Sequence, residues 1–285
     1  MGVLNNKIDF AVLIAVKDAN PNGDPLNGNR PRVTYDGYGE ISDVCIKRKL
    51  RNRLQDAGKE IFVQSEERAN DNCKSLSDRL KNFIGNEKLD HVTFASKVCE
   101  KWIDVRSFGQ VFAFKAVETN DGVSVGIRGP VSIQQARSIN PVDITSMQIT
   151  KSVNSETTDS GKKSSDTMGS KHMVNFGLYV VRGAINVQLA QRTGFTDEDA
   201  EAIKEALRTL FVNDSSSARP DGSMEVIKLY WWKHNNQIGQ YSSAKVQRTL
   251  HVQLKDGVET PSDVSDYDIS LDNLEGLKAE EIQGM

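Results

Sequence analysis

An uninterrupted apolar segment near the N-terminus places the strongest constraint on the fold. Residues 9–16 read DFAVLIAV and are followed by a stretch that is rich in turn-forming residues. A continuous, partly β-branched apolar run of this length is typical of a central strand that is buried on both faces. We therefore predict that this segment is the first strand and that it lies in the interior of a sheet.

The order of the strongest elements predicts the fold class. A helix is expected to begin after Ser42, a good N-cap residue, and to end at Gly58, and a second helix is expected after Thr196. Further strand-like segments lie at 123–139, 174–189 and 224–233, and a weaker strand-like segment lies at 105–117. The resulting order is strand, helix, strand, strand, helix, strand. This α+β arrangement, βαββαβ, is the ferredoxin-like fold that RNA-recognition domains share.

The spacing of these elements leaves two long insertions in one domain. We predict a single domain over residues 1–255, with insertions at 59–128 and 140–173, and an acidic C-terminal tail at 256–285. The second insertion contains the segment 151–172, in which nine of 22 residues are Ser or Thr and four are Lys. Such a segment cannot bury enough apolar surface to fold alone.

Charge is distributed unevenly along the chain. The 285 residues include 36 Lys or Arg and 39 Asp or Glu, and this near-neutral total of −3 argues against a nucleic-acid partner when taken alone. Residues 256–285, however, contain nine acids and one base, so they carry −8 and the first 255 residues carry +5. Arg30 and Arg32 end an Asn- and Gly-rich loop. Five cations between Lys47 and Arg53 predict an almost purely cationic exposed surface on the first helix.

Several classes of function lack their usual signatures. The longest apolar run, at 10–16, has seven residues where a membrane helix needs about 20, so we expect a cytoplasmic protein without a membrane span. The three cysteines form no Cys-x-x-Cys pair and the four histidines are scattered. The loop at 18–29 begins like a calcium-binding loop, but Asn29 replaces the required Glu and Pro21 interrupts it. We therefore expect neither a metal nor a cofactor.

Nucleic-acid binding is better supported by the residues. Arginine forks and lysine charges bind phosphates, and backbone N–H groups of a Gly-rich loop add neutral donors. The Lys-, Ser- and Thr-rich segment between two strands could order over an RNA strand. Phe108, Tyr230 and Trp232 could stack on bases, although aromatic residues in strand-like segments more often belong to the core.

Five stretches, taken together, match a known family. They read DANPNGDPLNGNRPR at 18–32, SDVCIKRKLRNRL at 42–54, VRSFGQVF at 105–112, GIRGPVSIQQARSI at 126–139 and TMGSKHMVNFGLYVVRGAI at 167–185. In this order and spacing the sequence resembles the CRISPR-associated Cas-seven family, specifically the backbone subunit of a type I-C, or closely related type I-B, Cascade surveillance complex. The resemblance covers most of the chain and fades after residue 255.

The resemblance implies an RNA-recognition-like palm with helical fingers at 59–128 and a thumb-like insertion at 140–173. Several copies would polymerise head to tail along one guide RNA (crRNA), with Cas-five and Cas-eight type subunits as further partners, and the guide bases would pair with target DNA. Met147 and Met168 are the candidates for interrupting the stacking of guide bases. The RNA-binding residues expected on this basis are Arg30, Arg32, Lys47, Arg48, Arg51, Arg106, Phe108, Gln110, Met147, Met168, Lys171 and His172.

The resemblance also implies that the chain is not an enzyme. Related type III backbone subunits cut target RNA with an acidic loop residue, but type I backbone subunits are not expected to cleave. Asp18, Asp24 and Asp104 are the nominal acids here, and the sequence offers no convincing base or metal partner for them. One alternative stays open: an endoribonuclease that processes precursor CRISPR RNA, as the related Cas-five subunit does in this system.

Overall fold

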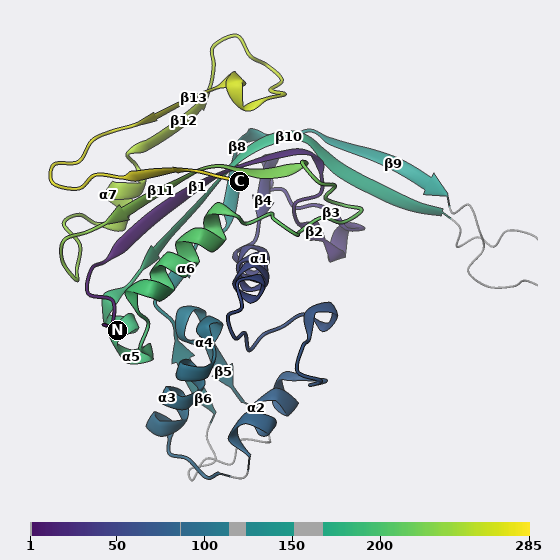
Figure 1. Cartoon of the computed structure of the whole chain (residues 1–285). Helices are drawn as coiled ribbons and strands as arrows, with labels where there is room; N and C mark the ends of the chain where they lie inside the picture. The colour runs from purple at the N-terminus through teal and green to yellow at the C-terminus, as the bar shows by residue number, and fades with distance from the viewer. Residues whose placement is uncertain (1, 86, 114–123, 151–167) are drawn as a thin grey trace, which may run out of the picture.

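An eight-stranded antiparallel sheet forms the centre of the protein (Figure 1). The computed structural model describes residues 2–85, 87–113, 124–150 and 168–285. In spatial order the strands are β14 (Glu280–Gln283), β11 (Met224–Lys233), β1 (Ile8–Ala19), β10 (Met168–Ile185), β8 (Ala136–Pro141) and β4 (Tyr38–Ile41), and β10 also pairs with β7 (Val131–Ile133) and β9 (Ile144–Thr150). The mixed α/β class with an antiparallel sheet confirms the coarse prediction.

Strand β1 is the interior strand that its apolar run predicts. It pairs with β10 on one side and with β11 on the other, so that Val12 lies between Val181 and Leu229. Its first nine residues are buried. The strand is longer than the predicted segment: it continues to Ala19, three residues beyond the end of the apolar run at Val16.

Each face of the sheet is covered by a separate layer. Helices α1 (Asp43–Asp56) and α6 (Asp197–Arg208) pack their apolar residues on one face, where they form the larger core. Helix α7 (Ser243–Gln247) and the two-stranded sheet of β12 (Leu250–Leu254) and β13 (Tyr267–Leu271) cover the other face. Tyr230 and Trp232 are 1% exposed beneath this second layer. They are therefore core residues and do not present a surface for base stacking.

Both predicted helices begin where their capping residues indicate, and α1 also ends as its glycine indicates. Ser42 Oγ accepts a hydrogen bond from the Cys45 N–H at the start of α1, and Gly58 adopts a positive φ of 74° just beyond its end. At α6, Thr196 and Asp199 form a capping box in which each side chain accepts a hydrogen bond from the other residue's backbone N–H.

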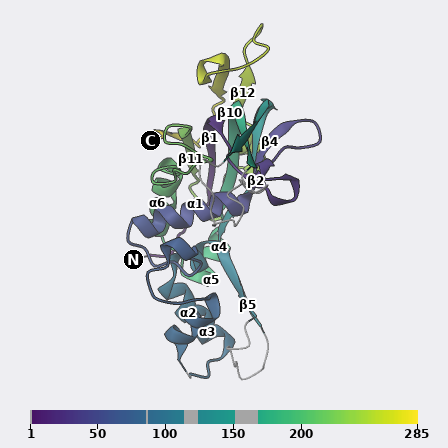
Figure 2. The ribbon, with the colours of Figure 1, turned by 90° about the vertical axis from the view of Figure 1, so that its right-hand side faces the viewer.

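A helical unit projects below the sheet and has its own small core. It contains α2 (Leu76–Ile84), α3 (His91–Lys101), α4 (Ile103–Phe108) and the hairpin of β5 (Gly109–Phe112) and β6 (Val125–Arg128). In the turned view of Figure 2, α1 lies across the lower end of the sheet with these helices beneath it. Their core residues include Phe62, Phe94, Trp102 and Phe112. We call this unit the fingers.

Parts of the strand prediction are wrong in this region. Residues 105–108 were expected in a strand but form the end of α4, because Ile103, Val105 and Ser107 are buried against neighbouring elements in a short helix. The predicted strand at 123–139 is divided into β6, β7 and β8 by turns. The expected strand at 174–189 stops at Ile185, and Val187–Thr193 form helix α5.

A buried carboxylate joins the fingers to α1. Asp104 is fully buried and accepts hydrogen bonds from the backbone N–H groups of Phe62 (2.7 Å) and Val63 (3.1 Å). It also forms an ion pair with Arg51 of α1, with 2.8 Å between Nε and Oδ2. Three donors thus converge on one carboxyl group: one comes from α1, and two come from the segment that leads from α1 into the fingers.

The C-terminal segment that was expected to form a tail contributes to the sheets. Residues 267–271 form β13, which pairs with β12, and 280–283 form β14, which pairs with β11 so that Ile282 lies opposite Leu229. Tyr267 and Leu277 are buried beneath this layer. Within the described ranges, no helix is both long and apolar enough to cross a membrane.

We predict that Asp104→Ala strongly destabilises the protein. Removing this carboxylate leaves Arg51 and two backbone N–H groups without a buried partner, which typically costs about 3–5 kcal/mol. The free energy of unfolding in urea should fall by this amount. Asp43→Ala, which removes an i,i+4 pair with Lys47 on the surface of α1, is the matched control and should cost less than about 1 kcal/mol. Equal losses for the two variants would contradict the anchoring role of Asp104.

Candidate nucleic-acid interface

The loop at 18–32 is an ordered hairpin that presents Arg30 and Arg32. Its strands β2 (Gly23–Asp24) and β3 (Arg30–Pro31) pair across a short 3-10 turn. Asp24 caps this turn and lies 3.5 Å from Arg32. The hairpin is compact because Gly23 has no side chain: a Cβ at this position would lie 2.0 Å from the Asn29 amide oxygen.

The hairpin of β9 and β10 has two different faces. Residues directly opposite each other in an antiparallel pair share a face, and successive residues alternate. Met168, Ser170 and His172 therefore lie on one face of the hairpin, together with Ser146 and Gln148 of β9. We call this the helix-side face, because the next pair on it, Val174 and Ile144, packs in the core beneath α1 and α6.

Arg30 contacts the helix-side face directly. Its Nη1 donates a hydrogen bond to Ser146 Oγ at 2.8 Å, and His172 Nδ1 lies 2.9 Å from the same oxygen. Met168 is 63% exposed further along this face. The structure thus brings together three of the predicted RNA-binding residues that are distant in sequence: Arg30, Met168 and His172.

Two other predicted residues lie on the opposite face of the hairpin. Lys171 pairs with Met147, and the neighbouring pair on this face is Gly169 with Ile149. Met147 is 41% exposed and Ile149 is 49% exposed. Met147 and Met168, which were predicted together as base-wedging residues, therefore point to opposite sides of the hairpin. The segment 151–167, which belongs to the predicted thumb, lies outside the described residues.

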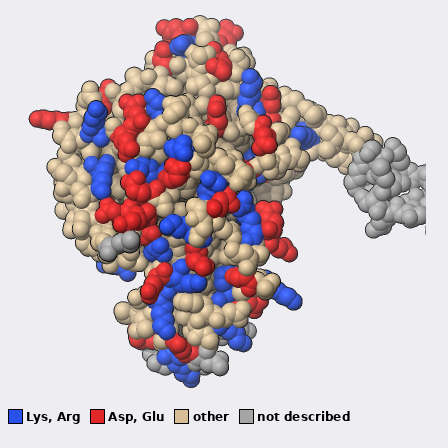
Figure 3. Space-filling view, viewed as in Figure 1, with Lys and Arg blue, Asp and Glu red and all other residues tan. Residues whose placement is uncertain are grey.

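Helix α1 does not have the purely cationic exposed surface that its sequence predicts. Arg51 is paired with buried Asp104, Lys47 lies 2.9 Å from Asp43, and Arg48 donates a hydrogen bond to the carbonyl oxygen of Val63 at 2.7 Å. Lys49 is 4% exposed and forms an ion pair with Asp214. Figure 3 accordingly shows basic and acidic side chains interspersed over this view of the molecule.

Arg106 and Gln110 are also engaged within the protein. Arg106 forms a bidentate ion pair with Asp199 of α6, with N–O distances of 2.8 and 2.7 Å. Gln110 on β5 donates a hydrogen bond to the carbonyl oxygen of Val111. Their predicted contacts with RNA remain predictions. The structure adds that Arg106 connects the fingers to the start of α6.

A basic pocket of about 510 Å³ lies where α1, α4 and the end of β10 meet. Lys7, Lys47 and Arg128 line it together with Phe108, and no acidic residue is among its lining residues. The ring of Phe108 is held by the guanidinium of Arg51, which lies 5.1 Å from the ring centroid. We call this site the basic pocket.

Arg128 differs from the other two cations of the basic pocket. Lys7 lies 3.2 Å from buried Asp9, and Lys47 is paired with Asp43. Burial acts to raise the pKa of Asp9, but the hydrogen bond from His234 and the charge of Lys7 lower this pKa below its usual value. Arg128 is exposed, and its side chain makes no ion pair or hydrogen bond with any residue that the structure describes. Its charge is therefore available to an anion.

Two glycines allow the backbone segments beside the basic pocket to cross closely. A Cβ at Gly129 would lie 2.2 Å from the Ser107 carbonyl oxygen, and a Cβ at Gly109 would lie 2.3 Å from the Ile127 carbonyl oxygen. Gly109 also has a positive φ of 80°. This crossing fixes Phe108 and Arg128 as neighbours, although they are 20 residues apart in the sequence.

Comparison with known proteins identifies the family. A family model described as "CRISPR-associated protein Cas7" matches residues 6–272. The chain belongs to this family. A curated relative of the same description from Haloferax volcanii is 27% identical over 214 residues, which are 70% of this chain. The chain spans 62% of the length of that relative.

One solved structure supports the fold of this Cas-seven-family chain. This structure, described as "CRISPR RNA-guided surveillance complex, pre-nicking", is 14% identical and superposes with a TM-score of 0.50, covering 88% of this chain and 83% of the other. This likeness supports the fold. A second, described as "CRISPR RNA-guided surveillance complex", gives a TM-score of 0.44 at 15% identity, covering 79% and 68% of the two chains.

Three residues of this Cas-seven-family chain were not predicted from its sequence, although they belong to the helix-side face of the hairpin or to the basic pocket. Arg128 lies in the GIRGPV motif that carried the resemblance. Only the structure shows that its side chain makes no ion pair or hydrogen bond with a described residue. Ser146 is bonded to Arg30, and Lys7 lines the basic pocket. Among the described residues, no group of three or more His, Cys, Asp or Glu side chains could hold a metal ion.

We predict that Gly129→Ala disrupts the backbone crossing of this Cas-seven-family chain. The new methyl group would overlap backbone atoms, which cannot move as a flexible side chain would, so we expect a loss of about 1–3 kcal/mol. Thermal unfolding should show a lower midpoint. Gly126→Ala is the control because nothing lies within 4 Å of its Cβ, and its effect should stay within about 0.5 kcal/mol. An unchanged midpoint for Gly129→Ala would contradict the close approach.

Proposed function

We propose that this chain is a non-catalytic backbone subunit that binds guide RNA (crRNA) in a CRISPR surveillance complex of the Cascade type. The observation that carries the proposal is the basic pocket, in which Arg128 has no ion pair or hydrogen bond with a described residue and the lining includes no acid. Family membership supports it independently. The type I-C or I-B assignment, a cytoplasmic location, and Cas-five and Cas-eight type partner subunits are part of the same proposal.

We infer that the palm resembles an RNA-recognition domain in its strand order. The strands β11, β1, β10 and β8 lie side by side in this order. In the predicted βαββαβ unit they are the fourth, first, third and second strands, respectively. RNA-recognition domains stack bases on the open face of such a sheet. Here α7, β12 and β13 cover that face. The RNA is therefore proposed to lie on the side that bears α1.

Two described sites lie toward the α1 side of the sheet and suit the backbone of an RNA strand. The helix-side face of the hairpin offers Arg30 and His172, and the basic pocket offers Lys47 and Arg128. Arginine and lysine hold phosphates without reading bases. An RNA gripped in this way keeps its base edges available, so that pairing with target DNA, and not the protein, reads the sequence.

We propose different roles for the remaining predicted residues. Arg51 and Arg106, which are already paired with buried or nearly buried carboxylates, would position the site. Lys171 and Met147 on the opposite face of the hairpin would face a neighbouring copy in a head-to-tail filament along the guide. The proposed RNA-contacting set is Arg30, Arg32, Lys47, Phe108, Arg128, Met168 and His172.

Arg128→Ala should weaken RNA binding without affecting the fold. Because the Arg128 side chain makes no hydrogen bond or ion pair with a described residue, the fold should be retained, and we expect affinity for a labelled guide RNA to fall about threefold to tenfold and the salt dependence of binding to decrease by about one ion. Fluorescence anisotropy at several salt concentrations measures both. Arg248→Ala is the matched control, since Arg248 is also exposed and unbonded through its side chain but lies between α7 and β12. Equal effects of the two variants would contradict a specific role for the basic pocket.

The purified chain should leave RNA intact. We expect labelled CRISPR repeat RNA to be bound but not cut, because no group of His, Cys, Asp or Glu side chains among the described residues could hold a metal ion for phosphodiester cleavage. Denaturing gel electrophoresis after prolonged incubation tests this. Specific cleavage that is lost in His172→Ala would support the endoribonuclease alternative instead.

A further inference from the structure

Ser146 joins two of the proposed RNA-contacting residues. Its Oγ lies 2.8 Å from Arg30 Nη1 and 2.9 Å from His172 Nδ1. The three residues belong to three different strands, with Arg30 on β3, Ser146 on β9 and His172 on β10. His172 lies directly opposite Ser146 in the β9–β10 pair, so the register of this hairpin brings the two side chains together. The function proposed above gives Ser146 no role.

The chemistry of the three groups sets the direction of the hydrogen bonds. A guanidinium has only donors, so Ser146 Oγ accepts the bond from Arg30. The hydroxyl proton of Ser146 is then available to the Nδ1 of a neutral His172, which assigns the ring proton to Nε2. Nε2–H of His172 and the other N–H groups of Arg30 are thus left as donors. Donors of this kind suit the oxygens of a phosphate.

Ser146 is the group that restrains both of these side chains. Among the described residues, its hydroxyl is the sole hydrogen-bond partner of the Arg30 guanidinium and of the His172 ring. Asp24 lies opposite Arg30 in the β2–β3 pair, but its carboxylate caps the turn and is paired with Arg32. Ordering a long side chain only when a ligand arrives reduces the affinity, so a restraint that already exists in the free protein favours binding.

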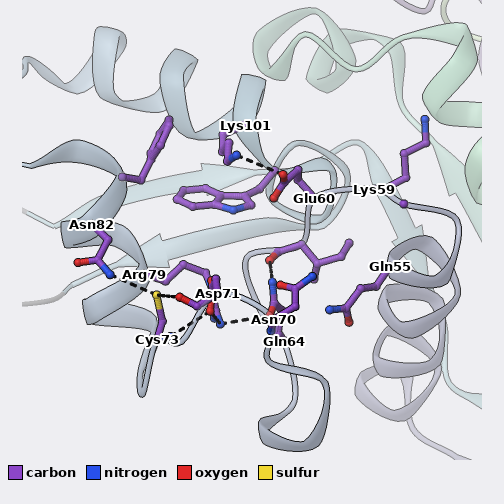
Figure 4. Close-up of a pocket in the computed structure, with 14 residues that line it drawn as sticks. Gln55, Lys59, Glu60, Gln64, Asn70, Asp71, Cys73, Arg79, Asn82 and Lys101 are labelled. Carbon is purple, nitrogen blue, oxygen red and sulfur yellow. Dashed lines mark hydrogen bonds and ion pairs between the residues drawn. The ribbon is translucent and has the colours of Figure 1, made fainter.

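A hydroxyl can position an arginine without neutralising its charge. Figure 4 shows the contrasting arrangement in the fingers, where the guanidinium of Arg79 is held by the carboxylate of Asp71. This contact is an ion pair, and it lowers the pKa of Asp71 to about 2, so the two opposite charges offset each other. Ser146 carries no charge. Arg30 therefore keeps its full positive charge for an external anion.

We propose that Ser146 is a positioning residue of the guide-binding surface. Its hydroxyl orders Arg30 and His172 on the helix-side face, so that the RNA backbone meets donors that are already in place. This inference rests on the function proposed above, in which Arg30 and His172 contact the RNA. It goes further because it assigns a role in binding to an uncharged side chain that acts through its two neighbours.

Replacing Ser146 by Val and by Thr separates the hydroxyl from the shape of the side chain. Both new residues are β-branched and suit an exposed strand position, but only Thr keeps a hydroxyl. We expect the affinity of the full chain for labelled single-stranded RNA to fall about threefold to fivefold in Ser146→Val and by less than about twofold in Ser146→Thr. Fluorescence anisotropy measures both affinities, and circular dichroism verifies the fold of each variant.

Thr145→Val is the matched control. Thr145 precedes Ser146 on β9 and lies on the opposite face of the hairpin, where its hydroxyl donates a hydrogen bond to the Asn175 amide oxygen at 2.6 Å. The control therefore removes one hydroxyl and one hydrogen bond from the same strand, and RNA affinity should be unchanged. An equal loss in Thr145→Val and Ser146→Val would overturn the positioning role.

A background without Arg30 and His172 tests whether Ser146 acts through them. In the double variant Arg30→Ala/His172→Ala the hydroxyl has nothing to position, so adding Ser146→Val should change RNA affinity by less than about 1.5-fold. A loss as large as in the unchanged chain would show that Ser146 contacts the RNA itself or supports the fold. Either result would contradict the inference.

The ring of His172 reports on the same hydrogen bond without RNA. Nitrogen-15 NMR of the imidazole, assigned with His172→Ala, should give the same Nδ1 signal in the unchanged chain and in Ser146→Thr, and a shifted signal in Ser146→Val. An unshifted signal in Ser146→Val would overturn the inference. If Arg128→Ala weakens RNA binding and Ser146→Val does not, the guide-binding proposal stands and the positioning role fails. An unchanged chain that binds no RNA would overturn the guide-binding proposal itself, and the positioning role with it.

Discussion

The continuity of β10 determines how the interface is built. This strand runs for 18 residues, about 60 Å, from the pair Ile185–Ile8 in the palm to the pair Met168–Thr150 in the hairpin. Because side chains alternate along a strand, the register of the pair Val174–Ile144, which packs in the core beneath α1 and α6, also decides which face His172 occupies. A slip of one residue would exchange the two faces and separate His172 from Arg30. The burial of the sheet thus fixes the chemistry of a hairpin that is itself mostly exposed.

Many charged side chains in this chain form ion pairs that stabilise the fold and are not available to a ligand. Two of the five cations of α1, Lys49 and Arg51, are paired with carboxylates from other segments, and the pair of Arg51 with Asp104 also holds the fingers in place. A buried ion pair contributes little net stability but is costly to break, so it favours one arrangement over others. Arg128, whose side chain makes no ion pair with any residue that the structure describes, comes from a short strand beside a glycine crossing. Cationic sequence density therefore indicates the region of the interface but not the residues that carry it.

Local signals could be predicted from the sequence, and pairings between distant segments could not. The apolar run of β1 and the caps of α1 and α6 depend on residues a few positions apart, and all were confirmed. Lys49 and Asp214 are 165 residues apart, and Arg51 and Asp104 are 53 apart, so the neutralisation of α1 left no local pattern. The strands β13 and β14 are short and lie in the acidic C-terminal segment, and their role is visible only from the strands they pair with. The opposite faces of Met147 and Met168 likewise follow from register alone.

The layer that covers the second face of the sheet explains why this palm would treat RNA differently from a free RNA-recognition domain. With Tyr230 and Trp232 enclosed by Val246, Leu250 and Tyr267, the strands offer no aromatic platform for bases. Under the proposed function, the strand is then held by phosphate contacts on the α1 side, which carry no sequence information. A subunit that stacked and read the guide bases itself would compete with target DNA for them. Covering the sheet face removes that competition. The apolar side chains of the C-terminal segment provide the cover.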